Sequence, residues 1–285
     1  MVLQAKTNIS LSTLLKAKRP LVMGILNITP DSFSDGNRYL LQQDALAHAR
    51  LMVEQGADII DIGAESTRPG AVAISEQEEL DRAMPVIEQL RNELPVALSI
   101  DTSKPMVMHA AVEAGVDMIN DINALQAEGA VMQAARLQVP VCLMHKQGTP
   151  ATMQQAPQYE AVVSEVIAFL RERVGCCEQA GIAREQIIID PGFGFGKTVA
   201  HNIALLKNLS ALQCLDLPVL VGLSRKAMFG ELLNKPVNER ANASVIAMTL
   251  AVLKGARIVR VHDVAPSVEA IRLLTALNNL EVKNV

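Results

Sequence analysis

Short apolar runs that end in polar residues recur eight times along the chain, and they constrain its fold more than any other feature. The runs span residues 21–27, 59–62, 96–100, 118–121, 141–145, 187–190, 219–223 and 257–262. Segments with helical spacing of apolar residues separate them, and four glycines stand where those helices would end, at Gly56, Gly115, Gly181 and Gly255. Strict alternation of strands and helices is typical of a parallel sheet, and eight such units predict a closed (β/α)8 TIM barrel. An open, doubly wound sheet is the alternative.

The length and the core composition fit one such barrel. The chain has 285 residues, and α/β barrels commonly reach roughly 250 residues or more as one unit. We therefore expect residues 1–285 to form a single domain. Half of the residues are apolar, but only 2% are aromatic and none is Trp, so the core must consist mainly of Ile, Leu, Val, Ala and Met. These side chains suit buried parallel strands.

The charge and the cysteines argue against several classes of function. A formal net charge of −4 without Lys/Arg runs disfavours a nucleic-acid partner. No apolar run is long enough to cross a membrane, and residues 1–18 lack the apolar core of a secretory signal, so no membrane partner is expected. Cys176 and Cys177 are adjacent, while Cys142 and Cys214 are isolated. This is neither a CxxC pair nor a disulfide framework, and it predicts a cytoplasmic protein.

Polar side chains stand at or near the end of each predicted strand. They are Asn27, Asp61, Asp101, Asn120, His145, Asp190, Ser224 and Arg260. Because a barrel places its chemistry at the carboxyl ends of its strands, these side chains are expected to converge on one mouth. Each could instead cap the next helix, as Asp, Asn and Ser commonly do. The set as a whole favours a site, because Arg260 and His262 are poor caps.

Two glycine-containing motifs resemble known signatures but depart from them in one respect each. Pro191–Thr198 resembles a nucleotide P-loop, but the spacing from Gly192 to Gly196 is one residue too short, and no Gly-x-Gly-x-x-Gly series is present. We interpret it as a flexible loop that lets the backbone approach a flat ligand. Residues 222–226 resemble the nucleophile elbow of serine hydrolases, but Lys226 replaces the closing glycine. Covalent serine catalysis is therefore not expected.

The last two strands indicate an anion site. Their ends carry basic and hydroxyl side chains, namely Ser224, Arg225, Lys226, Arg260 and His262. Barrels frequently bind phosphate there, and arginine grips phosphate oxygens through paired donors. The amide oxygen of Asn27 could ligate a Mg²⁺ ion that keeps most of its waters. These residues predict a phosphorylated or pyrophosphorylated substrate.

Asp101, Asp190 and Asn120 form the complementary half of the predicted site. Buried carboxylates and an amide can recognise the donor and acceptor edge of a guanidine-like heterocycle, and negative charge stabilises a developing cation. Structural ion pairs with Lys226 or Arg260 are the alternative, and the two interpretations are compatible.

The motifs, taken in order, resemble the signatures of the dihydropteroate synthase family. The resembling segments are 23–36, 61–70, 101–105, 120–122, 143–145, 190–197, 224–226 and 260–263. The resemblance implies a folate-biosynthesis transferase, a sulfonamide target, that joins a pterin pyrophosphate to p-aminobenzoate with Mg²⁺. It also implies a homodimer, and a dissociative reaction under the loops 28–40 and 64–78. Ala64 stands where many relatives have Gly.

The resemblance also implies a role for individual residues. Pterin would be held by Asp101, Asn120, Asp190 and Lys226, with Met144 nearby. The pyrophosphate and Mg²⁺ would be surrounded by Asn27, Arg68, Arg260 and His262, with Asn27 as the metal ligand. The p-aminobenzoate side would be shaped by Phe33, Thr67, Pro69, Gly194, Phe195, Ser224 and the stem of Lys226. The catalytic set would be Asp101, Lys226, Arg260 and His262.

Two other functions remain open on the sequence. A methyltetrahydrofolate methyltransferase has a related pterin-binding barrel, but it needs no pyrophosphate clamp such as Arg260 and His262 would form. A non-catalytic pterin-binding protein would keep the fold without turnover. The intact anion half disfavours both.

Overall fold

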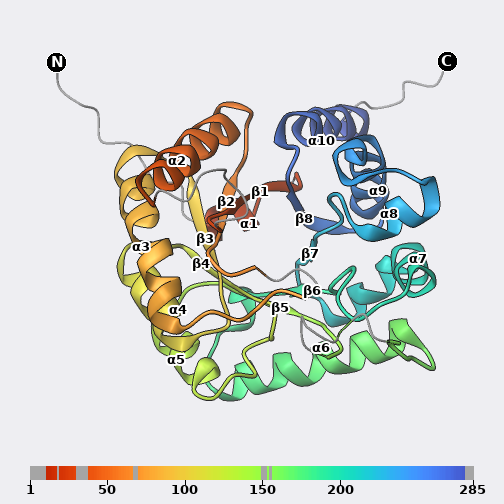
Figure 1. The fold of residues 1–285 in the computed structure, drawn as a ribbon. Coiled ribbons are helices and arrows are strands. Elements are labelled where there is room, and N and C mark those ends of the chain that lie inside the picture. Colours follow the sequence, from red (N-terminus) through yellow and green to blue (C-terminus); the bar gives the residue numbers. More distant parts are fainter. Residues whose placement is uncertain are drawn as a thin grey trace.

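Eight parallel strands close into a barrel in the order β1 to β8 (Figure 1). The computed structural model describes residues 11–17, 19–29, 38–66, 70–148, 153 and 156–279. The strands are β1 Leu21–Asn27, β2 Ile59–Gly63, β3 Ala97–Asp101, β4 Met118–Asp121, β5 Val141–Met144, β6 Ile187–Asp190, β7 Val219–Val221 and β8 Ala256–Val261. Because β1 pairs with β8, the TIM-barrel prediction is confirmed and the open-sheet alternative is wrong.

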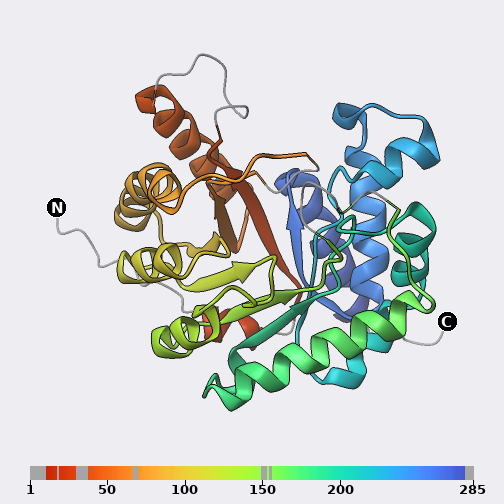
Figure 2. The same cartoon turned by 60° about the horizontal axis from the view of Figure 1, so that its bottom comes forward.

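A short helix, α1 Leu11–Leu15, lies at one end of the barrel, and longer and shorter helices surround it. The surrounding helices are α2 Arg38–Glu54, α3 Glu76–Glu93, α4 Pro105–Glu113, α5 Ala130–Leu137, α6 Val162–Gln179, α7 Val199–Lys207, α8 Ala227–Leu233, α9 Ala241–Leu253 and α10 Val264–Asn279. In Figure 2, α2 to α5 lie on one side of the strands and α8 to α10 on the other. None of the described helices is both long and apolar enough to cross a membrane.

The helix boundaries differ from the sequence patterns in three places. The spacing of apolar residues over 200–213 predicts one helix, but the structure divides this segment, because α7 ends at Lys207 and a 3-10 helix follows at Leu209–Leu215. Two helices follow β7: α9 corresponds to the helical spacing of apolar residues over 241–254, and α8 precedes it. Helix α2 begins at Arg38 and α3 at Glu76, so both start inside the ranges expected to be loops.

The barrel interior contains one apolar layer, which we call the inner layer. It consists of Leu21, Met23, Ile59, Ala97, Met118, Cys142, Ile188, Leu220 and Ile258, with Leu11 of α1 packed against it. Each large side chain that is fully buried in this way stabilises the fold by about 1.5–3 kcal/mol. A second, larger cluster fills the space between the strands and the outer helices.

Strand geometry places the polar side chains directly above the inner layer. Successive residues of a strand face opposite sides, so every second residue points inward. The residue two positions after each inner-layer residue therefore also points inward. These residues are Asp61 (after Ile59), Asn120 (after Met118), Met144 (after Cys142), Asp190 (after Ile188) and Arg260 (after Ile258). On β3, Asp101 points inward after Ala97 and Ser99. The same alternation that builds the core therefore presents the polar residues to the mouth.

Helix α1 covers the opposite end of the barrel. Its Leu11 side chain is buried against the inner layer. Arg257, on β8, holds the end of α1 by donating hydrogen bonds to the carbonyl groups of Leu15, Ala17 and Arg19. Side chains and a short helix thus close the barrel at the end away from the polar residues.

Candidate active site

Arg260 links two buried carboxylates across the mouth of the barrel. Its Nε donates to Asp61 Oδ2 at 2.6 Å, and its Nη2 donates to Asp101 Oδ2 at 2.8 Å. Asn120 Nδ2 donates to the same Asp61 oxygen at 3.1 Å. Four strands, β2, β3, β4 and β8, therefore contribute to one hydrogen-bonded group, as the strand-end pattern predicts.

The other oxygen of each carboxylate is an unused acceptor. Among the described residues, neither Asp61 Oδ1 nor Asp101 Oδ1 has a hydrogen-bond partner, although both atoms are buried. A buried polar atom without a partner costs about 1–3 kcal/mol, so such atoms are rare. Two of them beside each other indicate a site that is completed by the donors of a ligand.

Burial shifts the pKa values of the acidic and basic groups toward neutrality. It raises the pKa of Asp101 to about 7, because Arg260 offsets only part of the cost of burial. It raises the pKa of Asp190 to about 6, although the hydrogen bond from the Gly192 amide works against it. Burial also lowers the pKa of Lys226 to about 8, while Asp190 acts in the opposite direction. Groups with such shifts cluster at functional sites.

Lys226 lies between the acidic group and the loop after β6. Its Nζ is 4.3 Å from the centre of the Phe195 ring, a cation–π distance. Gly194 has φ of 79°, and a Cβ there would come within 3.1 Å of Lys226 Cδ. Glycine therefore lets this loop come close to the lysine, as predicted for a segment whose backbone approaches a ligand.

His262 and Ser224 form the neighbouring part of the mouth. The Ser224 hydroxyl accepts a hydrogen bond from the His262 amide at 3.1 Å and lies 3.0 Å from His262 Nδ1. Burial, together with Arg260 and Arg225, lowers the pKa of His262 to about 4. The ring is therefore neutral at pH 7, and a hydroxyl donating to Nδ1 would leave the proton on Nε2.

Arg225 differs from the sequence interpretation, which grouped it with the anion site. Its guanidinium makes a paired contact with Asp263, with Nε–Oδ2 at 3.0 Å and Nη2–Oδ1 at 2.6 Å. Its backbone has φ of 54°, and its amide donates to Ser244 Oγ. The ion pair holds the β7 and β8 ends together, which is a structural role.

The loop after β6 is held by a lysine to which the sequence reasoning gave no role. Lys197 is 2% exposed, and its Nζ donates to the carbonyl oxygens of Gly192 at 2.9 Å and Phe195 at 3.1 Å. It also lies 2.9 Å from His145 Nδ1. Burial lowers the pKa of Lys197 to about 7 and that of His145 to about 3. The only available signal was the position of Lys197 directly after the glycine-rich motif.

Most of the predicted site residues lie at this mouth. Those that occupy strand ends or the loops just after them are Asn27, Asp101, Asn120, Met144, Asp190, Gly194, Phe195, Ser224, Lys226, Arg260 and His262. Phe33, Thr67, Arg68 and Pro69 lie outside the described residues. Asp61 was noted as a strand-end residue but received no role, although it is the closest partner of Arg260.

The described side chains include no group of three or more His, Cys, Asp or Glu arranged to hold a metal. Asn27 ends β1 with its side chain half-buried, and its Oδ1 would lie 3.4 Å from a Cβ placed on Gly63. A single amide oxygen at the mouth fits a cation that is held mainly by water and by the substrate. It does not fit a structural metal site.

The chain matches the family model of the pterin binding enzymes over residues 23–262. It is 50% identical over 264 residues to the dihydropteroate synthase of Escherichia coli K12, covering 93% of this chain and 94% of that one. It is 51% identical over 260 residues to the dihydropteroate synthase of Haemophilus influenzae, covering 91% and 94% of the two chains.

Solved structures give the same result. The dihydropteroate synthase of Xanthomonas albilineans with 4-aminobenzoic acid is 49% identical, with a TM-score of 0.88 and coverage of 93% of this chain and 95% of that chain. A Yersinia pestis dihydropteroate synthase in a sulfonamide complex is 50% identical, with a TM-score of 0.88 and coverage of 92% and 95%. The Xanthomonas enzyme with 7,8-dihydropteroate has a TM-score of 0.84 at 46% identity, with coverage of 93% and 95%.

Proposed function

Since the chain belongs to the pterin-binding enzyme family, and within it to the dihydropteroate synthases, we infer that it joins hydroxymethyl-dihydropterin pyrophosphate to p-aminobenzoate. The products are 7,8-dihydropteroate and pyrophosphate, in a step of folate biosynthesis. One structural observation supports this reaction above all others. Arg260 stands between two buried carboxylates, and each carboxylate keeps one acceptor oxygen without a partner among the described residues.

The carboxylates and Asn120 are proposed to bind the pterin. A pterin presents ring and amino N–H donors along one edge, and these would satisfy the buried oxygens of Asp61, Asp101 and Asp190. As the bond between the methylene carbon and the pyrophosphate oxygen breaks, positive charge develops on the pterin. Asp101 stabilises this charge when it is ionised, which its raised pKa of about 7 permits at and above neutral pH.

Arg260 and His262 are proposed to hold the leaving group. Two of the five N–H donors of the Arg260 guanidinium are used by Asp61 and Asp101, and the others remain for phosphate oxygens. His262 offers Nε2–H if Ser224 donates to Nδ1. The electron pair of the broken bond leaves with the pyrophosphate, so a cationic and donor-rich surface stabilises the transition state.

Mg²⁺ is part of the proposal. Asn27 would hold it by its amide oxygen together with water and pyrophosphate oxygens, which are the hard ligands that the ion prefers. When bound, Mg²⁺ supplies additional positive charge to the departing pyrophosphate.

The arylamine of p-aminobenzoate is proposed to attack from the side of Phe195 and the Lys226 stem. Lys226 Nζ lies 4.3 Å from the centre of the Phe195 ring, and these two side chains would form one side of the p-aminobenzoate pocket. The amine nitrogen uses its lone pair to form the new C–N bond and then loses a proton. Because an arylamine is already neutral near pH 7, no strong base is required.

We also propose that the protein is a homodimer. Helix α9 exposes Ile246, Leu250 and Leu253 at 62%, 45% and 63% of their surfaces, and their spacing places them on one face. Leu232 and Leu233 of α8 are half exposed as well. A second copy of this chain would cover this apolar surface. The cytoplasmic location stays a prediction of the cysteine pattern.

The experiment that tests the function measures pyrophosphate release and pterin binding separately. When p-aminobenzoate is added, the protein should release pyrophosphate from the pterin substrate over many turnovers, and dihydropteroate should form in equal amount. Pterin binding without release would support a non-catalytic protein. Methyl transfer from methyltetrahydrofolate to a corrinoid, without pyrophosphate release, would support the methyltransferase alternative.

A further inference from the structure

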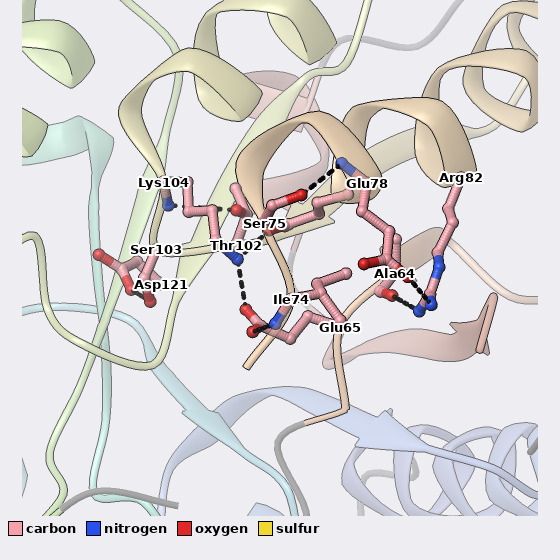
Figure 3. Close-up of polar contacts among 11 residues, drawn as sticks. Ala64, Glu65, Ile74, Ser75, Glu78, Arg82, Thr102, Ser103, Lys104 and Asp121 are labelled. Carbon is pink, nitrogen blue, oxygen red and sulfur yellow. Dashed lines mark hydrogen bonds and ion pairs between the residues drawn. The ribbon is translucent and has the colours of Figure 1, made fainter. Parts of the chain in front are cut away.

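A partly buried ion cluster lies beside the mouth and connects two of its loops (Figure 3). Lys104 Nζ donates to Glu65 Oε2 at 2.6 Å and to Glu79 Oε2 at 2.5 Å. Glu65 follows β2, Glu79 lies in the first turns of α3, and Lys104 follows β3. None of these residues belongs to the proposed substrate-binding set, so the cluster requires another explanation.

Glu65 ties together both ends of the segment that links β2 to α3. While its Oε2 accepts from Lys104, its Oε1 accepts the backbone N–H of Ile74 at 2.9 Å. Ser75 then caps α3 by accepting from the Glu78 amide at 3.1 Å. One carboxylate therefore fixes the start and the end of the segment 65–74 at once.

The backbone around Lys104 is itself well fixed. Pro105 begins α4 and restricts the preceding residue to an extended backbone, and Lys104 has φ of −100° and ψ of 120°. The Lys104 amide donates to Thr102 Oγ1 at 3.2 Å, and its side chain takes no part in capping the helix. Asp101, which pairs with Arg260, precedes Lys104 by only three residues. The lysine thus connects the β3 end of the site to the β2 segment.

Glu79 shows that the cluster is more than a surface ion pair. Its side chain is fully buried, and its Oε1 has no hydrogen-bond partner among the described residues. A buried carboxylate is costly unless it is paired, and Lys104 is the cation that pairs it. Burial alone would lower the pKa of Lys104, but Glu65 and Glu79 raise it above its ordinary value, so the ammonium group stays charged.

We propose that Lys104 is a positioning residue, which holds the β2–α3 segment in register with the substrate site through Glu65. This inference rests on the proposed function. The family resemblance assigns Thr67 and Pro69, which follow Glu65 in the chain, to p-aminobenzoate, and Arg68 to pyrophosphate. Loss of the Lys104–Glu65 contact should therefore impair p-aminobenzoate use and leave binding of the pterin ring itself nearly intact.

The test uses a double variant, Glu79→Met with Lys104→Met. Replacing both members of a buried ion pair by apolar residues is commonly neutral for stability, so the variant should fold while Glu65 loses its cation. The KM for p-aminobenzoate should rise about 10- to 100-fold, the range expected when a positioning contact is lost. The dissociation constant for hydroxymethyl-dihydropterin, which lacks the pyrophosphate, should stay within about twofold of wild type. The single variant Lys104→Arg keeps the positive charge, so its KM for p-aminobenzoate should stay much closer to wild type than that of the double variant.

A second measurement does not depend on activity. Hydrogen exchange of the Ile74 amide should become roughly tenfold faster in the double variant, because its acceptor is no longer held. The matched control is Arg50→Met with Glu93→Met, which removes an exposed ion pair at the other end of α3. This control should change neither the KM nor the exchange rate.

The outcomes separate the two proposals. A folded double variant with wild-type KM and wild-type Ile74 exchange would overturn the positioning role. An equal loss of pterin and p-aminobenzoate affinity would also overturn it, because that result indicates general loosening. Wild-type protein that forms no dihydropteroate would instead refute the proposed function, and the Ile74 exchange would still test the anchor.

Discussion

Replacement of Arg260 by lysine would separate the geometry of the guanidinium from its charge. The two contacts to Asp61 and Asp101 use donors on different nitrogens, at 2.6 Å and 2.8 Å. A lysine ammonium keeps the charge but lacks the planar fork, so at least one contact should be lost. A charge-assisted hydrogen bond contributes about 1.5–3 kcal/mol, and a preorganised transition-state donor contributes about 2.7–4 kcal/mol.

These values predict that kcat for pyrophosphate release falls roughly 30- to 900-fold, which corresponds to about 2–4 kcal/mol. The assay is continuous detection of pyrophosphate with both substrates saturating. Arg257→Lys is the control, because Arg257 lies on the same strand but binds carbonyl groups at the closed end of the barrel. A near-wild-type kcat in Arg260→Lys would refute the view that the reaction needs the contacts of Arg260 with both Asp61 and Asp101.

Thermal unfolding of Arg260→Ala tests the contribution of Arg260 to the stability of the fold. This variant leaves Asp61, which is fully buried, without its cation, and breaking a buried pair in this way costs about 3–5 kcal/mol. An Arg260→Ala protein as stable as wild type at pH 8 would contradict the arrangement of charges described for the mouth.

Three further results are expected. Asp190→Ala should weaken pterin binding roughly 10- to 100-fold in calorimetry but leave binding of p-aminobenzoate analogues nearly unchanged, since one charge-assisted acceptor of the pterin is lost; unchanged pterin affinity would contradict this role. The kcat/KM of the wild-type enzyme should rise as the pH increases through about 7, because burial raises the pKa of Asp101 in the free enzyme to about 7 and only its ionised form stabilises the cation; a flat profile of kcat/KM across neutral pH would count against Asp101. Sulfonamides should compete with p-aminobenzoate and bind more tightly when pyrophosphate and Mg²⁺ are present, as a labelled sulfonamide titration would measure; equal affinity in both conditions would remove the support for this coupling.

Local patterns in the sequence were sufficient to predict the barrel and the place of its chemistry. Glycines at helix ends and alternating strand residues act over a few positions, so Asp101, Asn120 and Asp190 could be placed at the mouth from their own neighbours. These signals need no knowledge of distant contacts.

The residues that the sequence interpretation misjudged depend on contacts between distant positions. Asp61 and Arg260 are 199 residues apart, and no local pattern indicates which strand-end carboxylate the arginine would contact. The motif around Arg225 predicts an anion ligand, whereas its guanidinium pairs with Asp263, 38 residues away in the chain. Lys104 and Glu65 both lie in segments that resemble the family signatures, but the sequence does not indicate that these two side chains form an ion pair.

The barrel is closed at the end that α1 covers, and this restricts the order in which the two substrates can bind. Leu11 and the inner layer fill that end, so both substrates would pass through the mouth. Asp61 and Asn120 lie on the strands, deeper than Phe195 and Ser224, which lie on the loops beyond them. The pterin must then bind before p-aminobenzoate. If p-aminobenzoate binds first, it blocks the path of the pterin to the deeper part of the site. High p-aminobenzoate concentrations should therefore slow the approach to steady state when the pterin is added last.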